Sequence, residues 1–301
     1  EYGRADKGAV YMLLAKLYLN AEVYTGENRY KDALLYAEKV INSGYSLKSN
    51  YNELFLADNN LENNEVIFSV NFDGTHTRTY GGTTFIIHAS TGGSMTAADF
   101  GINSGWGGLR STKNLVNLFP ATDGSIDKRG VFHTDGQNFE INAIGAFTDG
   151  YPLIKFKNIT KSGAAGSDTG GDFVDTDFPL FRLADAYLIY AEAVLRGGGG
   201  NMSTALQYVN ALRTRAYGNT SGNVTSINLD FILDERAREL AWEATRRTDL
   251  IRFGKFTSGS YLWPFKGGVQ DGRAVEDYRK LYPIPTNDLI ANPNLVQNQG
   301  Y

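Results

Sequence analysis

The sequence has no cysteine, only 7 prolines in 301 residues and no long run of apolar residues. Without cysteine, the chain can form no disulfide, thiolate metal site or cysteine nucleophile. The lack of a long apolar run excludes a transmembrane helix. Neither sign of charge dominates, because 29 basic residues stand against 33 acidic ones and the formal net charge is −4. This balance gives the chain no electrostatic reason to bind nucleic acid or to lie on a membrane surface.

Recognisable catalytic and metal-binding motifs are also missing. The sequence contains no H-E-x-x-H zinc motif and no G-x-S-x-G nucleophile elbow. The glycine run 197–200 lacks the Lys-Ser/Thr of a phosphate-binding loop and follows a helical pattern, so it is interpreted as a turn. An acidic stretch fails the EF-hand spacing, which favours a solvated loop over a calcium site: Asp168, Asp172, Asp175 and Asp177. We therefore predict no metal site and no cofactor.

Aromatic residues make up 13% of the chain, and 34 residues are glycine. This composition suggests long ordered loops around a helical frame. Apolar residues with helical spacing predict hairpins of two helices at about 7–44 and 180–217, and the first face consists of Val10, Leu13, Leu14 and Leu17. In each hairpin two alanines lie twelve positions apart, which suits close antiparallel helices of the tetratricopeptide type: Ala21 with Ala33, and Ala193 with Ala205.

The other parts of the chain have different patterns. Residues 45–179 form a loop-rich excursion, in which alternation at 66–71 predicts a short strand. A third helix is expected from Asp230 to Arg252, with an apolar stripe that needs a partner surface: Leu233, Ala237, Leu240, Ala241 and Ala244. The region 229–301 is expected to comprise this helix and an extended tail. We predict a mainly α fold with a few short strands, organised as a single body over residues 1–301.

The residue with the strongest indication of binding is Trp106, which has Gly105, Gly107 and Gly108 around it. Glycine neighbours let an indole stand clear of its loop, where it can stack on the apolar face of a pyranose. The alternative is that the indole packs under its own loop. Five further residues are candidate ligand contacts: Tyr80, Arg110, Asp99, His88 and Trp263.

Two glutamates, Glu239 and Glu243, lie four positions apart and so share one face of the third helix. Paired carboxylates can hydrolyse glycosides, and a glycan-cleaving enzyme is therefore one hypothesis. Basic residues three or four positions along the same helix favour ion pairing within it instead, as Arg246 and Arg247 do for Glu243. We predict a structural role for these carboxylates and no enzymatic activity.

Motifs in several parts of the chain form a recognisable set. The third helix contains ILDERAREL at 232–240 and RRTDLIR at 246–252. The tail contains YPIP at 282–285, NPNL at 292–295 and QNQGY at 297–301, and the chain opens with GRA at 3–5 and AKLYL at 15–19. Together these motifs resemble the SusD/RagB family over most of the helical parts.

The resemblance implies a non-catalytic protein at the cell surface of the outer membrane. It implies binding of an oligosaccharide or polysaccharide and delivery to a TonB-dependent transporter, on a scaffold of tetratricopeptide-like hairpins with large loop insertions. Family members have an N-terminal portion, with a lipidated cysteine and the first hairpins, that this chain is expected to lack. Contact with the membrane is then expected only through that lipid anchor. The alternative is a scaffold subunit of a nutrient-uptake complex whose ligand is a peptide or a glycoprotein glycan.

Overall fold

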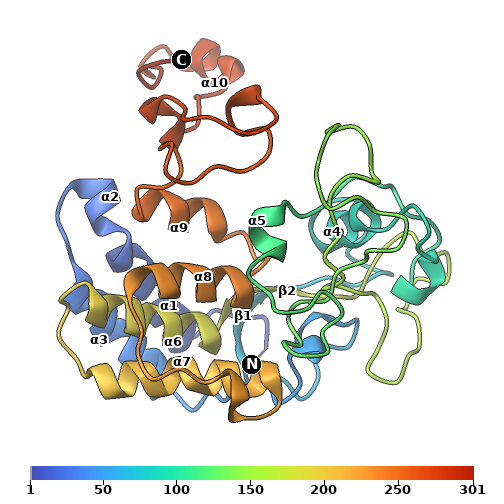
Figure 1. Ribbon diagram of the computed structural model, residues 1–301, viewed down its shortest axis with the longest axis horizontal. Helices are drawn as coiled ribbons and strands as arrows, with labels where there is room; N and C mark the ends of the chain where they lie inside the picture. Colours follow the sequence, from blue (N-terminus) through green and yellow to red (C-terminus); the bar gives the residue numbers. More distant parts are fainter. Residues whose placement is uncertain (1) are drawn as a thin grey trace. The chain divides into compact units, whose positions relative to one another are not determined.

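Helices dominate the structure, a computed structural model that describes residues 2–301 (Figure 1). The described residues contain ten α-helices, several 3-10 turns and one two-stranded sheet. The chain divides into two compact units, a first unit up to Arg246 and a second unit from Arg247 to Tyr301. No helix within residues 2–301 combines the length and the apolar character needed to cross a membrane. The prediction of a mainly α fold is confirmed.

The first hairpin consists of α1 (Lys7–Leu19) and α3 (Tyr30–Ile41), with the short α2 (Ala21–Thr25) between them. The Asp6 carboxylate caps α1 by accepting a hydrogen bond from the Ala9 amide at 2.9 Å. Gly26, with φ of 77°, ends α2 in the left-handed conformation that glycine adopts without strain. The two long helices pack against each other through small and apolar residues: Ala9, Met12 and Ala15 on α1, and Ala33, Ala37 and Val40 on α3.

The buried face of α1 is not the one that the sequence pattern suggested. Val10, Leu13 and Leu17 are 51%, 47% and 46% exposed. Apolar residues occur all round α1, so the 3.6-residue period is satisfied by two different stripes. The small residues are buried because they let α3 approach closely. Val10, Leu13 and Leu17 form a second apolar face, which is about half exposed.

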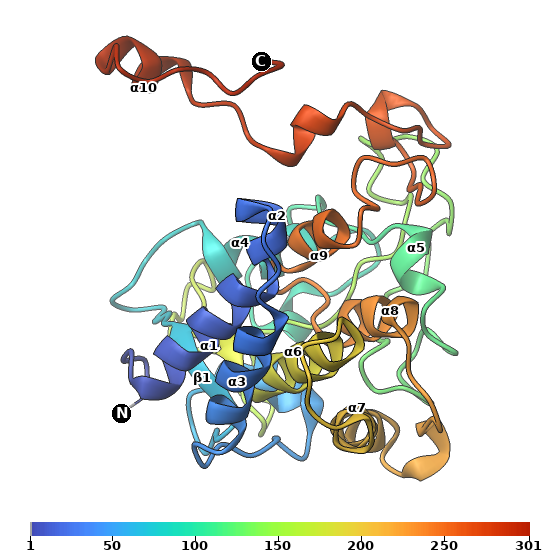
Figure 2. The same cartoon turned by 90° about the vertical axis from the view of Figure 1, so that its left-hand side faces the viewer.

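The second hairpin consists of α6 (Leu183–Leu195) and α7 (Met202–Tyr217). Their connection contains Gly197, Gly199 and Gly200, all with positive φ, and the Asn201 side chain caps α7. Figure 2 shows the helices in layers, with α3 between α1 and α6, and α7 on the far side of α6. The four alanines with twelve-residue spacing are all buried in this stack: Ala21, Ala33, Ala193 and Ala205.

The excursion between the hairpins contains one strand of the sheet and ends in the other. The strands β1 (Val66–Val70) and β2 (Phe178–Arg182) pair antiparallel, with Val66 opposite Arg182 and Val70 opposite Phe178. The expected strand at 66–71 is therefore present. The excursion also contains α4 (Gly82–Ser90) and α5 (Lys113–Val116), and it has an apolar core of its own that includes Tyr51, Leu54, Phe55, Phe100 and Phe156.

The single helix expected from 230 to 252 is wrong, because the chain forms α8 (Leu229–Glu239) and α9 (Arg246–Arg252) with a break between them. In the break Trp242 and Ala244 both have φ of 59°, a left-handed backbone. Side chains occupy the carbonyls that would continue the helix. Tyr51 and Arg182 donate to the Glu239 carbonyl, and Lys155 donates to that of Ala241. Ala244, expected in the apolar stripe, is exposed.

The second unit is built largely of turns. It contains α10 (Thr286–Ala291) in the tail that the sequence analysis expected to be extended, and none of its residues forms a strand. The Arg247 guanidinium lies 4.2 Å from the centre of the Tyr282 ring. The Gln297 side chain both donates to and accepts from the backbone of Ile284, which fixes the end of the tail against its beginning.

Candidate functional site

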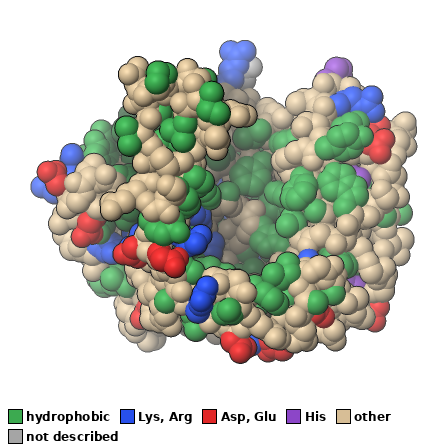
Figure 3. All heavy atoms as spheres, turned by 90° about the horizontal axis from the view of Figure 1, so that it is seen from above, with side chains coloured by type: hydrophobic (Ala, Val, Ile, Leu, Met, Phe, Trp, Pro, Cys, Tyr) green, Lys and Arg blue, Asp and Glu red, His purple; other side chains and the backbone are tan. Residues whose placement is uncertain are grey.

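Four aromatic rings meet at the surface of the excursion and are called here the aromatic surface: Tyr80, Phe85, Trp106 and Phe173. The Trp106 ring centre lies 6.2 Å from that of Tyr80 and 6.1 Å from that of Phe85, and Phe173 lies 5.0 Å from Tyr80. Tyr80 is 61% exposed, Phe85 45% and Trp106 43%. Figure 3 shows hydrophobic side chains gathered at the surface on the right of the view, over the part of the chain that contains α4.

The loop of Trp106 is held by the carboxyl end of α4. The last carbonyls of a helix have no partner within the helix. Here the amides of Trp106, Gly107 and Gly108 supply the partners by donating to His88, Thr91 and Ala89 at 2.7 to 2.9 Å. A Cβ on Gly105 would collide with the Thr91 carbonyl. Gly105 is therefore required by a close approach of two backbones, and the glycines on both sides of the indole leave the ring uncovered.

His88 lies beneath the indole. Its ring is stacked on that of Trp106, with centres 4.6 Å apart and an angle of 23° between the planes. Nδ1 lies 2.7 Å from the Ser104 carbonyl and Nε2 lies 3.1 Å from the Asp172 carbonyl, and the residue is 1% exposed. Both ring nitrogens are thus engaged by the backbone. The structure places His88 as a support of Trp106, not at the surface as a ligand contact.

The Arg110 guanidinium is occupied in a similar way. It donates to the carbonyls of Gly108, Ile144, Ala146 and Asp149. Burial lowers the pKa of Arg110. The side chain therefore joins the loop of Trp106 to the loop 144–149, and most of its donors are used within the protein.

The remaining two candidates are Asp99 and Trp263. Asp99 is exposed on the 3-10 turn Ala97–Phe100, and its charge opposes the fall in the Lys157 pKa that burial causes. None of the contacts made by the described residues joins Asp99 to the aromatic surface. Trp263 belongs to the second unit, where Lys266 Nζ lies 4.5 Å from the centre of its ring.

The sequence analysis missed Phe85 and Phe173. Phe85 lies three positions before His88 on α4, and a helical assignment for 82–90 would have placed both side chains on one face. No local signal marks Phe173. Asp168 positions it by accepting a hydrogen bond from its amide at 3.0 Å, and Arg78 lies 4.7 Å from the centre of its ring.

The acidic stretch near Phe173 is satisfied by backbone donors. Asp168 also accepts from the amides of Gly170 and Asp172, and Asp175 accepts from those of Gly74 and Ser167. Within residues 2–301 no group of three His, Asp or Glu side chains is placed to hold a metal ion. These carboxylates shape the loop that presents Phe173.

The carboxylates Glu239 and Glu243 lie in a buried ion-pair network. Glu239 accepts from Arg129, Arg182 and Arg215, and Glu243 accepts from Lys155 and Arg182. Burial by itself raises the pKa of Glu239, but the charges of the three arginines outweigh it and hold that pKa below its ordinary value. Glycoside hydrolysis needs one carboxyl with a raised pKa, which Glu239 does not have, and both carboxylates are paired with buried basic side chains.

We expect Gly105→Ala to lower the free energy of unfolding by about 1–3 kcal/mol, because the new methyl group meets a backbone carbonyl that cannot move freely. Urea unfolding followed by tryptophan fluorescence measures the change. Gly108→Ala is the matched control, since its Cβ would have only ordinary contacts at 3.6 Å or more. Equal stability of the two variants would contradict the close approach described here.

Comparisons with known proteins agree with this architecture. A model of the SusD family matches residues 134–301. The starch-binding protein SusD of Bacteroides thetaiotaomicron is 38% identical over the whole chain, which spans 61% of that protein. The SusD-like protein P25 of Formosa agariphila is 26% identical, over 99% of this chain and 60% of its own length. The chain thus spans about three fifths of the length of these relatives.

A solved structure gives the same result for the fold. Surface glycan-binding protein A from Bacteroides thetaiotaomicron, in complex with laminarihexaose, is similar to this chain with a TM-score of 0.73 and 26% identity. The similarity covers 99% of this chain and 65% of that one. It extends over the hairpins and the excursion that carries the aromatic surface.

Proposed function

The chain belongs to the SusD family, and we propose from this premise that it binds an oligosaccharide or polysaccharide without cleaving it, at the aromatic surface. The observation that carries the proposal is the exposure of three neighbouring rings, in which Trp106 contacts both Tyr80 and Phe85. A soluble protein rarely leaves such a group of large apolar side chains at its surface unless something binds there.

The geometry suits a sugar. One face of the indole is covered by His88, and the residue is still 43% exposed, so area is left on which the apolar face of a pyranose can stack. Tyr80 and Phe85 are tilted by 54° and 56° to the indole, which makes the surface curved. The exposed Arg78, whose guanidinium lies over the Phe173 ring, supplies donors for hydroxyl groups.

The names of similar proteins support a glucan as the first ligand to test. One relative is named for binding starch, and the similar structure holds laminarihexaose. Both are polymers or oligomers of glucose, with different linkages. We therefore propose a neutral glucan as the ligand class.

We also propose that the bound glycan is delivered to a TonB-dependent transporter, and that the protein acts at the cell surface of the outer membrane. Membership of the family supports this step. Copurification of the native protein with such a transporter from detergent-solubilised outer membranes tests it. Recovery of the protein without any transporter would count against delivery.

The second candidate function is a scaffold for protein partners, with sugar binding secondary. The observation that favours it is the exposed apolar face of α1, formed by Val10, Leu13 and Leu17. Affinity electrophoresis against a panel of polysaccharides distinguishes the two. A scaffold alone would migrate at the same rate in every gel, whereas a glycan-binding protein is retarded in at least one. Reducing-end assays on the same polysaccharides test for cleavage.

Trp106→Ala is expected to weaken glucan binding roughly five- to tenfold, because loss of one stacked ring removes about 1 kcal/mol. Calorimetric titration with the same oligosaccharide measures the change. Tyr24→Ala is the control, since Tyr24 is an exposed aromatic residue like Tyr80, at 61%, but lies on α2, at the other side of Figure 1 from α4. Unchanged affinity in a folded Trp106→Ala variant would remove the aromatic surface from the binding path.

A further inference from the structure

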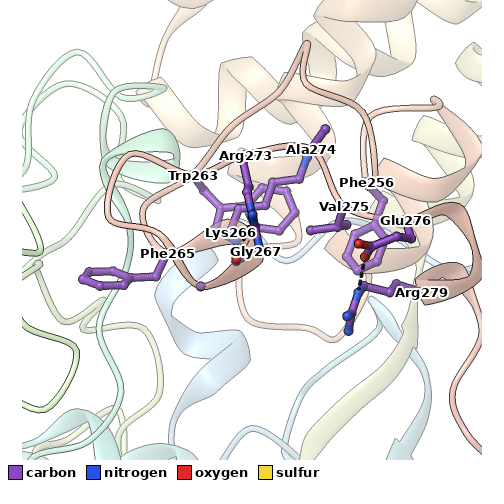
Figure 4. A pocket seen from close by; sticks show the side chains of 11 residues that line it. Phe256, Trp263, Phe265, Lys266, Gly267, Arg273, Ala274, Val275, Glu276 and Arg279 are labelled. Atoms are coloured by element: carbon purple, nitrogen blue, oxygen red, sulfur yellow. Dashed lines mark hydrogen bonds and ion pairs between the residues drawn. The ribbon is translucent and has the colours of Figure 1, made fainter. Parts of the chain in front are cut away.

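The second unit contains a pocket of about 370 Å³ that lies entirely within residues 256–279 (Figure 4). This volume is in the range of small-molecule sites in proteins. Its walls combine aromatic rings with charged side chains. The residues that carry the argument are Phe256, Trp263, Lys266, Arg273, Glu276 and Arg279.

The aromatic wall is rigidly held. The rings of Phe256 and Trp263 have centres 5.9 Å apart and are inclined by 33°. Lys266 lies against the indole and donates from Nζ to the carbonyls of Ser258 and Tyr261 at 2.6 and 2.7 Å. Lys266 is 2% exposed, so it places a fixed positive charge in the wall of the pocket.

The rim carries two arginines with donors to spare. Arg273 donates from Nε to the Gly267 carbonyl at 3.1 Å, and Arg279 donates from Nε to the Glu276 carboxylate at 2.9 Å. The terminal nitrogens of both guanidinium groups have no hydrogen-bond partner among residues 2–301. Each arginine can therefore still offer a planar pair of N–H groups to an acceptor.

The backbone at the rim is shaped for this arrangement. Phe265 has φ of 64°, a left-handed conformation that is uncommon for an aromatic residue, and its ring points away from the other labelled side chains in Figure 4. Gly267, also left-handed, makes room for Arg273, since a Cβ there would lie 2.8 Å from Arg273 Cγ. Strain of this kind is common at ligand clamps.

The charge of the second unit differs from that of the whole chain. Residues 247–301 contain seven Lys and Arg against five Asp and Glu, although the formal net charge of the protein is −4. Around the pocket three basic side chains, Lys266, Arg273 and Arg279, stand against Glu276 alone. An anionic ligand is therefore attracted to this pocket.

We propose that this pocket is a second binding site, specific for an acidic sugar unit whose carboxylate pairs with Arg273 and Arg279. A flat aromatic wall suits the apolar face of a pyranose, and a guanidinium pair suits a carboxylate. Glu276 accepts from a hydroxyl group of the same ring. A hexuronate unit satisfies all three, whereas a neutral hexose leaves the arginines without an acceptor. The proposal does not depend on the aromatic surface of the first unit.

Calorimetry on the full chain tests the proposal, with a trimer of galacturonate and the neutral glucose trimer maltotriose as probes. We expect Arg273→Gln to weaken binding of the galacturonate trimer about tenfold or more, because a charge-assisted pair is lost. Trp263→Ala should weaken it about fivefold through loss of the ring. Added salt should weaken galacturonate binding to the parent chain.

Control variants separate this site from the aromatic surface. Arg29→Gln removes an exposed arginine that pairs with Asp32 in the first hairpin, and it should leave galacturonate binding unchanged. Trp106→Ala should also leave it unchanged, while affecting any binding of maltotriose. Galacturonate binding that is lost in Trp106→Ala would place the ligand on the aromatic surface and overturn the second site.

Two other results would also overturn the proposal. One is the absence of galacturonate binding to the parent chain, and the other is equal affinity of the parent and Arg273→Gln. Competition with inorganic sulfate distinguishes a sugar site from a simple anion site. Full displacement of the galacturonate trimer by sulfate at matched concentration, with no effect of Trp263→Ala, would show that only the anion is recognised and would contradict specificity for a sugar.

Discussion

Glu239→Gln is expected to lower the free energy of unfolding by about 3–5 kcal/mol, because it removes one partner from a buried ion-pair network. The Glu239 side chain is fully buried and accepts hydrogen bonds from Arg129, Arg182 and Arg215. When Glu239 is replaced by a neutral residue, these three buried guanidinium groups lose one of the carboxylates that balance their positive charge. An amide fills the same space, so the change isolates the electrostatic contribution from packing.

Urea unfolding followed by circular dichroism measures the effect. Glu62→Gln is the control, because Glu62 pairs with Lys161 at 2.8 Å but both side chains are at least half exposed. An exposed pair contributes about 0–1 kcal/mol. Similar unfolding free energies for the two variants would show that the buried network does not stabilise the fold.

Acid unfolding gives a second measurement of the same network. Burial by itself raises the pKa of Glu235, but Arg129, Arg238 and Arg213 outweigh it and lower that pKa to about 2 from 4.5. The folded state therefore binds fewer protons than the unfolded state between these two values. The stabilisation is complete above pH 4.5 and is lost as the pH falls towards 2. Because the pKa of Glu239 is lowered too, Glu239→Gln should make this loss less steep.

Leu240→Asp is expected to lower the free energy of unfolding by about 3 kcal/mol or more, because it places a carboxylate in an apolar environment. Leu240 is 3% exposed and packs in the core cluster shared by both helical hairpins. It follows the last residue of α8, so the substitution also disturbs the point at which the helix ends. The thermal midpoint and the urea midpoint both measure the loss.

Ala244→Asp is the matched control for Leu240→Asp. The sequence pattern put both positions in one apolar stripe, but Ala244 is exposed and has φ of 59°. Aspartate adopts this backbone conformation more readily than alanine, so a change within about 0.5 kcal/mol is expected. If Leu240→Asp unfolded at the same urea concentration as Ala244→Asp, the burial of this end of α8 would be disproved.

Several features could be predicted from the sequence because they depend on residues close together in the chain. The spacing of apolar residues predicted the two hairpins, and the glycine run 197–200 predicted the turn between α6 and α7. The motifs of α8, α9 and the tail predicted the family. The glycines around Trp106 predicted an indole in an open loop, and the ring is 43% exposed.

Other features were decided only by the tertiary structure. The period of α1 allowed two apolar faces, and the close approach of α3 selected the one with small residues. The helix α8 ends at Glu239 because the carbonyl of Glu239 accepts a hydrogen bond from Tyr51, which lies 188 positions earlier in the chain. The residues next to Glu239 in the sequence cannot show that a distant side chain takes the place of a helical amide as hydrogen-bond donor.

The aromatic surface shows the same division. The sequence indicated Trp106 and Tyr80, but it assigned ligand contacts to His88 and Arg110. The side-chain nitrogens of these two residues face backbone carbonyls of distant loops instead. Phe173 lies 67 positions after Trp106 in the chain. It belongs to the aromatic surface because its ring contacts that of Tyr80, which in turn contacts Trp106. The sequence by itself determined the helical frame and the glycine-flanked ring. Which polar side chains face solvent depended on hydrogen bonds between segments far apart in the chain, and these exist only once the chain is folded.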